Sequence, residues 1–96
     1  MAELVWTKES ERWLKDIFDY ISADNPRGAR DTVDGIYDRA QTLLTFPESG
    51  YRYEGSTEEV RILLHSHYRI AYTVAGDKII VLGVFHGALA IERYLL

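Results

Sequence analysis

The last third of the chain decides the fold: residues 60–85 read VRILLHSHYRIAYTVAGDKIIVLGVF. β-Branched and aromatic residues, which favour strands, are concentrated in three runs, at 60–64, 68–74 and 79–85. Gly76 and Asp77 separate the last two runs and predict a two-residue hairpin turn, because glycine adopts a positive φ without strain. A second turn is expected near Ser66. The stretch therefore predicts three consecutive antiparallel strands.

Two amphipathic helices are predicted before these strands. Apolar residues recur at helical spacing from residue 8 to residue 22, with Thr7 as the expected N-cap. Asn25 and Pro26 mark the start of a second helix, since asparagine caps helices and proline is favoured in the first turn. This helix is expected to end at Phe46-Pro47. Because few residues connect the two helices, we expect an antiparallel helical hairpin.

The order of elements predicts an α+β fold. A short strand at 4–7 precedes the first helix, and a loop at 48–56 follows the second. The expected order is β-α-α-β-β-β with a short C-terminal tail, in which the helical hairpin packs on a mostly antiparallel sheet. Ninety-six residues allow one domain, covering residues 1–96.

The composition excludes several classes of function. The chain has no cysteine, which excludes disulfides and thiol catalysis. It has neither an 18-residue apolar run nor a signal peptide, so we expect a cytoplasmic protein without a membrane role. Eleven Lys and Arg against fifteen Asp and Glu give a net charge of −4, whereas nucleic-acid binders are usually basic. Any role on nucleic acid would need a local cluster of positive charge.

The predicted hairpins suggest such a cluster. Counting back from the Gly76-Asp77 turn places Arg69 opposite Val84, on the same face as His86. A three-residue loop at 65–67 would add Arg61 to this face. A slip of one residue in either turn would break the arrangement.

The cationic face is expected to point away from the helices, because burying unpaired arginines is costly. The side chains expected against the helical hairpin are those of Tyr68, Ile70, Tyr72, Val74, Val81 and Phe85. Those expected beside the cations on the open face are Ile80, Leu82 and Val84.

Several phrases, taken in order, resemble the RelE/ParE superfamily of bacterial type II toxins, and its ParE-like branch in particular. They are the helix start DNP and the stretches FPESG, VRILLHSHYRIAYTV and VLGVFHGA, and the resemblance covers residues 4–94. It implies a toxin that a cognate antitoxin binds and neutralises. ParE-like members inhibit DNA gyrase, whereas RelE-like members cleave mRNA on the ribosome without a metal.

The resemblance also implies roles for individual residues. Arg69 matches the strand arginine that the nucleases direct at the scissile phosphate, and His86 matches the general acid of YoeB-like members. If the chain is a nuclease, the catalytic candidates are His86, Arg69 and Arg61. The candidates for binding a target or an antitoxin are Arg52, Arg61, Arg69, His86 and Arg93.

Departures from the nuclease pattern favour the ParE-like interpretation. RelE-type nucleases place lysines before or within the second strand, and this chain has none between Lys15 and Lys78. YoeB-like nucleases follow the histidine with a tyrosine, where this chain has Gly87. A non-enzymatic toxin that acts on DNA gyrase is therefore favoured, with a ribosome-dependent mRNA endoribonuclease as the alternative. A third possibility is a module that only binds its antitoxin.

Structural roles remain open for the same side chains. Arg69 could pair with a carboxylate such as Glu92, and His86 could satisfy backbone groups at a strand end. His65, His67 and His86 lack carboxylates at ligand spacing, so no metal or other cofactor is expected.

Overall fold

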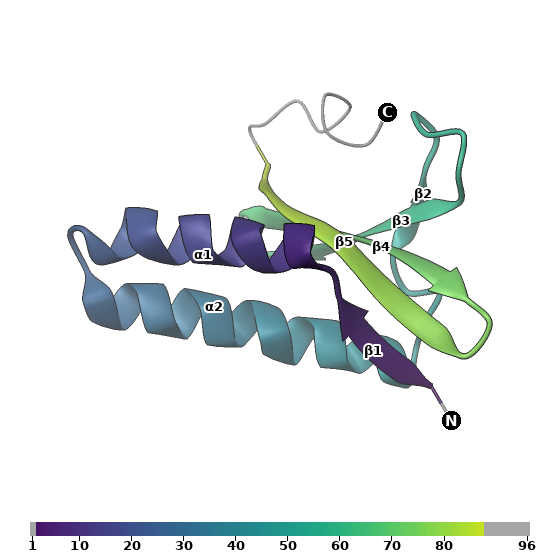
Figure 1. Cartoon of the computed structure of the whole chain (residues 1–96), viewed down its shortest axis with the longest axis horizontal. Coiled ribbons are helices and arrows are strands. Elements are labelled where there is room, and N and C mark those ends of the chain that lie inside the picture. The colour runs from purple at the N-terminus through teal and green to yellow at the C-terminus, as the bar shows by residue number, and fades with distance from the viewer. Residues whose placement is uncertain (1, 88–96) are drawn as a thin grey trace.

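The computed structural model describes residues 2–87 as a five-stranded mixed sheet beside a helical hairpin (Figure 1). The elements are β1 (Glu3–Trp6), α1 (Lys8–Ser22), α2 (Pro26–Gln41), a 3₁₀ turn η1 (Thr42–Leu44), β2 (Tyr51–Tyr53), β3 (Val60–His65), β4 (Tyr68–Ala75) and β5 (Lys78–His86). The strand order across the sheet is β1-β5-β4-β3-β2. The predicted α+β class and the order of the predicted elements are confirmed, and β2 is an extra strand within the expected loop.

Local capping explains where the two helices begin. The Thr7 hydroxyl accepts a hydrogen bond from the Ser10 N–H at 3.1 Å, and the Asn25 side chain accepts one from the Gly28 N–H at 2.9 Å. A Cβ at position 28 would lie 2.4 Å from the Asn25 amide, so glycine leaves room for the cap. Both starts agree with the prediction. The α-helical part of α2 ends earlier than expected, at Gln41, and continues as η1.

The sheet is antiparallel except at its first strand. β1 runs parallel to β5 and pairs with it from Glu3↔Lys78 to Trp6↔Val81. This pairing covers the first half of β5 and leads the chain directly into α1 through Thr7, whose hydroxyl donates to the Val81 carbonyl at 2.9 Å.

A β-bulge interrupts the β4–β5 hairpin. The turn is as predicted, with Gly76 at φ 63°. Pairing continues regularly as far as Tyr72↔Val81, and the next pair is Ala71↔Gly83. β5 therefore carries one more residue than β4 at this point, and everything beyond is displaced by one position.

The bulge overturns the predicted pairing of Arg69 and His86. Arg69 lies opposite Phe85 and not Val84, while His86 lies opposite Tyr68. Because side chains alternate along a strand, Arg69 and His86 are on opposite faces of the sheet.

The β3–β4 turn also differs from the prediction. Its loop has two residues, Ser66 and His67, with Ser66 at φ 55°, where three were expected. Arg61 consequently lies opposite Tyr72, on the face directed toward the helices. The predicted convergence of three cationic groups on the open face is wrong.

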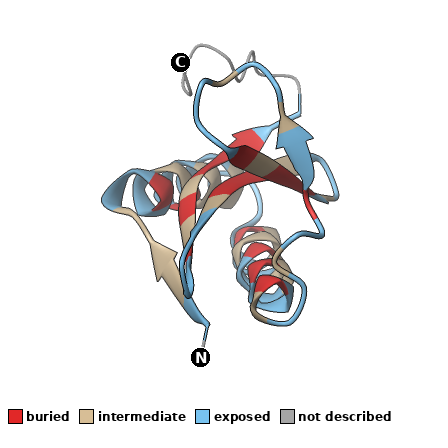
Figure 2. Cartoon of the chain, turned by 90° about the vertical axis from the view of Figure 1, so that its right-hand side faces the viewer, coloured by how far each residue is buried: buried red, intermediate tan, exposed pale blue. Residues whose placement is uncertain are grey.

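Buried residues occur along the strands of the sheet and in both helices (Figure 2), and the apolar ones among them form two clusters. The cluster between sheet and helices contains Leu14, Ile36, Leu43, Leu63, Ile70, Tyr72, Ile79, Val81 and Val84. A second cluster on the other face contains Val60, Ile62, Ala71 and Phe85. Val84 and Phe85 thus exchange the faces predicted for them, since both follow the bulge. Val74, which was expected against the helices, is 42% exposed and not in the core.

No helix within residues 2–87 is long and apolar enough to cross a bilayer.

Candidate functional site

Arg61 is engaged with backbone carbonyls. Its guanidinium donates to the carbonyl oxygen of Gly50 at 2.8 Å and, at 3.4 Å, to that of Glu48. Across the β2–β3 pair it faces Arg52, which is exposed. These contacts tie the segment between η1 and β2 to the sheet, so Arg61 is placed to stabilise the fold.

Tyr72 binds the same segment from the interior. Its buried hydroxyl donates to the Pro47 carbonyl at 2.8 Å and accepts from the Gly50 N–H at 3.0 Å. Burial raises the pKa of the Tyr72 phenol. The phenol therefore stays protonated and can donate this hydrogen bond.

Arg69 and His86 border a common hollow at the end of the sheet, although they lie on opposite faces. A shallow hollow of about 330 Å³, which we call the end hollow, is lined there by Leu64, Ser66, His67, Tyr68, Arg69, His86 and Gly87. The Gly87 N–H donates to the His67 carbonyl at 2.7 Å. The imidazole rings of His67 and His86 are stacked with their centroids 6.3 Å apart. One guanidinium and two imidazoles therefore border the end hollow, and Arg61 is not among them.

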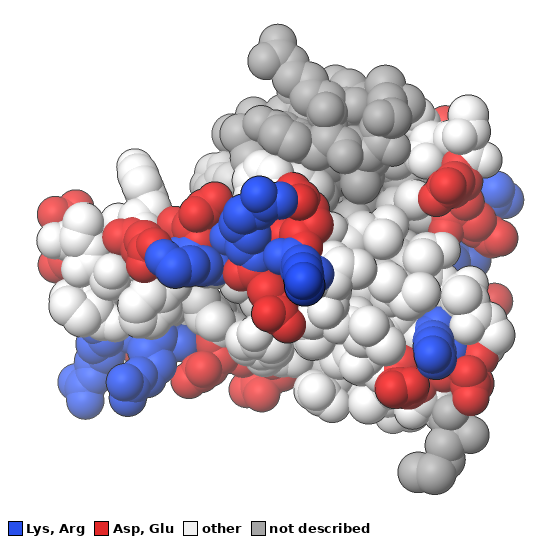
Figure 3. All heavy atoms as spheres, in the orientation of Figure 1, with Lys and Arg blue, Asp and Glu red and all other residues white. Residues whose placement is uncertain are grey.

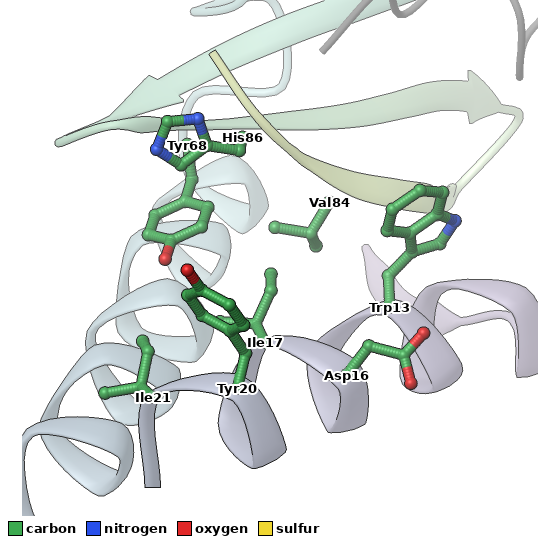
Figure 4. Close-up of a pocket in the computed structure, with 8 residues that line it drawn as sticks. All are labelled: Trp13, Asp16, Ile17, Tyr20, Ile21, Tyr68, Val84 and His86. Carbon is green, nitrogen blue, oxygen red and sulfur yellow. The ribbon is translucent and has the colours of Figure 1, made fainter. Parts of the chain in front are cut away.

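A larger hollow lies on the helix side of His86 (Figure 4). This helix-side hollow measures about 550 Å³ and is lined by Trp13, Asp16, Ile17, Tyr20 and Ile21 of α1 together with Tyr68, Val84 and His86. The Tyr68 ring stands perpendicular to the His86 imidazole, with centroids 5.6 Å apart. Burial raises the pKa of the Tyr68 phenol. His86 is thus shared by both hollows.

Sequence reasoning missed the contribution of α1 to this surface. Trp13, Ile17 and Ile21 belong to the apolar residues at helical spacing within the helix predicted over residues 8–22. The helical hairpin, however, projects beyond the sheet (Figure 1), so the outer part of the stripe borders the helix-side hollow. Tyr20, which is 85% exposed, was not predicted to belong to any site. An apolar stripe that continues for more turns than a short sheet can cover is the signal that could have revealed the hollow.

The remaining charged candidates do not form a single basic patch. Acidic and basic side chains are interspersed over the face seen in Figure 3. On α1, Arg12 pairs with Glu9, and Lys15 pairs with Asp19 at 2.7 Å, an ion pair that raises the pKa of Lys15. Arg93 and the suggested partner Glu92 lie outside the described residues. Within residues 2–87, no three His, Asp or Glu side chains are grouped as metal ligands would be.

The two hollows suit different ligands. The end hollow presents a guanidinium and two imidazoles, which can contact an anionic group. The helix-side hollow is walled by aromatic and aliphatic side chains with one carboxylate at its rim, an arrangement that suits an apolar segment of a partner.

The comparison with protein families identifies the chain. The family model of the ParE toxin of type II toxin–antitoxin systems, parDE, matches residues 4–90. The chain belongs to this family. No curated protein sequence matches this ParE-family toxin.

A solved structure has the same fold as this ParE-family chain. It is described as the chromosomal ParDE TA system from P. aeruginosa and is similar with a TM-score of 0.76. The similarity covers 90% of this chain and 96% of that chain, at 22% sequence identity. The resemblance noted from the phrases of the sequence is thereby confirmed at the level of the superfamily and of its ParE-like branch.

Proposed function

We propose that this ParE-family toxin arrests growth by binding a protein target, DNA gyrase, and that a cognate antitoxin binds and neutralises it. The proposal rests on family membership and on one structural observation. The bulge in β5 places Arg69 and His86 on opposite faces of the sheet, while Arg61 is held by the carbonyls of Glu48 and Gly50.

This observation argues against phosphoryl-transfer chemistry. A metal-independent nuclease needs several preorganised positive groups around the phosphate, aimed at the charge that develops in the transition state. Arg61 is directed elsewhere, and no lysine occurs between Lys15 and Lys78 to replace it. A surface that recognises a protein has no such requirement.

A ribosome-dependent mRNA endoribonuclease remains the second candidate. It is favoured by the end hollow, where Arg69 and the imidazoles of His67 and His86 border one space. In that case Arg69 would hold the phosphate, and His86 would protonate the leaving 5′-oxygen.

An induction experiment separates the two candidates. The chain is expressed in a bacterial host with and without the product of the neighbouring gene, while plasmid supercoiling and mRNA integrity are followed. Growth arrest with inhibited supercoiling and intact mRNA, relieved by coexpression, is the expected result. Codon-registered mRNA cleavage with normal supercoiling would establish the nuclease, and absence of arrest would contradict both candidates.

A further inference from the structure

An exposed aromatic surface lies at the opposite end of β4 from the end hollow and the helix-side hollow. Phe46 is 65% exposed, and Val74, near the β4–β5 turn, is 42% exposed. Two adjoining hollows of about 450 and 250 Å³ follow the segment after η1, and Pro47 and Glu48 line both of them. Phe46 borders the larger hollow and Val74 the smaller one. We call this area the Phe46 surface and define it by Phe46, Pro47, Glu48, Glu59 and Val74.

The backbone that carries Phe46 is fixed on both sides. The Phe46 N–H donates to the Thr42 carbonyl at 2.9 Å, and the Ser49 N–H donates to the Phe46 carbonyl at 3.1 Å. Gly50 is hydrogen-bonded to the Tyr72 hydroxyl and lies so close to this side chain that a Cβ would be 2.7 Å from the Tyr72 ring. A surface that is ordered in advance loses little conformational entropy on binding. An exposed phenylalanine at this position is therefore suited to anchor a partner.

The Phe46 surface presents unpaired carboxylates beside its aromatic ring. Glu48 and Glu59 are exposed, and neither has an ion-pair partner among residues 2–87. The guanidinium of Arg61 borders the smaller hollow, but it donates to the carbonyl oxygens of Glu48 and Gly50. The two carboxylates are thus available to a basic group that arrives with a partner.

The Phe46 surface is remote from the helix-side hollow. Tyr68 borders that hollow, whereas Val74 lies six residues further along β4. At about 3.3 Å per residue, the two positions are about 20 Å apart. Substitutions on the Phe46 surface therefore leave the helix-side hollow intact.

We propose that the Phe46 surface contacts the protein target of the toxin. The Phe46 ring enters an apolar recess of the target, Val74 packs at the edge of this contact, and a lysine or arginine of the target pairs with Glu48 and Glu59. A folded protein fits better than a short segment, because most of the ring is exposed on a fixed turn and so can fill a recess. This inference rests on the proposed inhibition of a protein target and names the surface and the chemistry of that contact.

The test measures how the full chain inhibits supercoiling by purified DNA gyrase and how tightly it binds this enzyme. Phe46→Ala is expected to raise the concentration for half-inhibition, and Kd, by roughly tenfold or more, the effect of losing an anchor residue. Combining Glu48→Gln with Glu59→Gln is expected to raise Kd by about three- to tenfold at about 0.05 M salt, and by less at about 0.2 M salt, because salt screens the ion pairs. Combining Glu48→Lys with Glu59→Lys should weaken binding further by repelling the basic group.

Matched control variants keep the test specific. Tyr51→Ala removes another exposed aromatic ring, on the other face of the sheet, and Glu11→Gln removes a carboxylate of α1. Each should inhibit gyrase as the unchanged chain does. All variants should keep their affinity for the product of the neighbouring gene, and thermal unfolding verifies that each one is folded.

The outcomes separate the inference from the function on which it rests. If the unchanged chain neither binds nor inhibits gyrase, the proposed target is wrong and the inference fails with it. If the unchanged chain inhibits gyrase, and Phe46→Ala and the double glutamine variant inhibit it as strongly as the controls do, the contact is not at the Phe46 surface. An equal loss of affinity for the gene product would make the antitoxin the occupant, and self-association that Phe46→Ala abolishes would make it a second copy. Either result would overturn the inference.

Discussion

Tyr72 and Arg61 show how single side chains of this sheet hold a neighbouring segment in place. Both reach the segment between η1 and β2, where Tyr72 contacts Pro47 and Gly50, and Arg61 contacts Glu48 and Gly50. The strand that follows this segment, β2, has only three residues and so offers few backbone hydrogen bonds to anchor it. The hydrogen bonds from Tyr72 and Arg61 therefore contribute to holding the segment in position.

Replacing Tyr72 with phenylalanine isolates the contribution of the hydroxyl. Tyr72→Phe leaves the Gly50 N–H and the Pro47 carbonyl without their partner inside the protein, which we expect to lower the free energy of unfolding by about 1–3 kcal/mol. Denaturant titration measures the change. Tyr51→Phe on the exposed face of β2 is the control and should be neutral. If Tyr72→Phe lowered the free energy of unfolding no more than Tyr51→Phe does, the Tyr72 hydroxyl would not be what holds the segment.

Replacing His86 with glutamine tests its chemical role directly. Glutamine keeps a polar group of similar shape but cannot act as a general acid, a role that contributes roughly 10²- to 10⁴-fold to a rate. Because a protein-binding toxin does not need this proton, we expect His86→Gln to arrest growth nearly as strongly as the unchanged chain. Growth curves after induction provide the measurement. Loss of arrest in a folded variant that still binds the antitoxin would favour the nuclease.

At the scale of elements, the helices were predictable and the register of the sheet was not. The start of α1 at Lys8 and that of α2 at Pro26 are determined by residues within one turn, so capping rules locate them. Strand register depends on pairing across the sheet, where a bulge or a shorter loop displaces every later pair. The strand content was therefore predicted, whereas the faces of Arg61, Arg69 and His86 were not.

The missed elements have the same explanation. β2 is three residues long, YRY, within a stretch rich in glycine, serine and charge. Its pairing with β3 from Tyr51↔Ile62 to Tyr53↔Val60 has no local signature. The helix-side hollow likewise results from the relative lengths of α1 and the sheet, which no local pattern specifies.

Gly83, which follows the bulge, is a position at which the packing of Phe85 can be tested. A Cβ at this position would lie 2.6 Å from the Phe85 ring, which is only 2% exposed and has little room to move. We expect Gly83→Ala to destabilise the protein by about 1–3 kcal/mol through overpacking. Thermal or denaturant unfolding measures this loss.

A double variant supplies the control for Gly83→Ala. Phe85→Leu shortens the facing side chain, so adding it to Gly83→Ala should cost less than the sum of the two single changes. Strict additivity would indicate that the Phe85 ring is not what the new methyl group meets.

At the scale of the whole molecule, we expect binding of the antitoxin to raise the thermal stability of the chain. A chain of 96 residues buries a limited core, so a ligand that binds only the folded state adds appreciably to its stability. At a free antitoxin concentration of about 100 times Kd the gain is about 2.7 kcal/mol. We expect Tm to rise by roughly 10–20 °C, given the usual shift for a domain of this size.

The measurement is a thermal scan of the purified chain with increasing amounts of the neighbouring gene product. An unrelated acidic protein at the same concentrations controls for crowding. A Tm that does not depend on the concentration of the gene product would contradict the proposed partnership.

The extra residue in β5 determines how the chemistry of this surface can change by mutation. The bulge displaces every later position by one, so that Tyr68 pairs with His86 and Arg69 pairs with Phe85. Deletion of Leu82 would make the ladder regular but leave these pairs unchanged, and would therefore keep the imidazole of His86 and the guanidinium of Arg69 on opposite faces. Substitutions that abolish the bulge, so that Leu82 pairs with Ala71, would instead place Arg69 opposite Val84, on the same face as His86. A change of pairing at unchanged chain length is thus what would bring the two groups to one face.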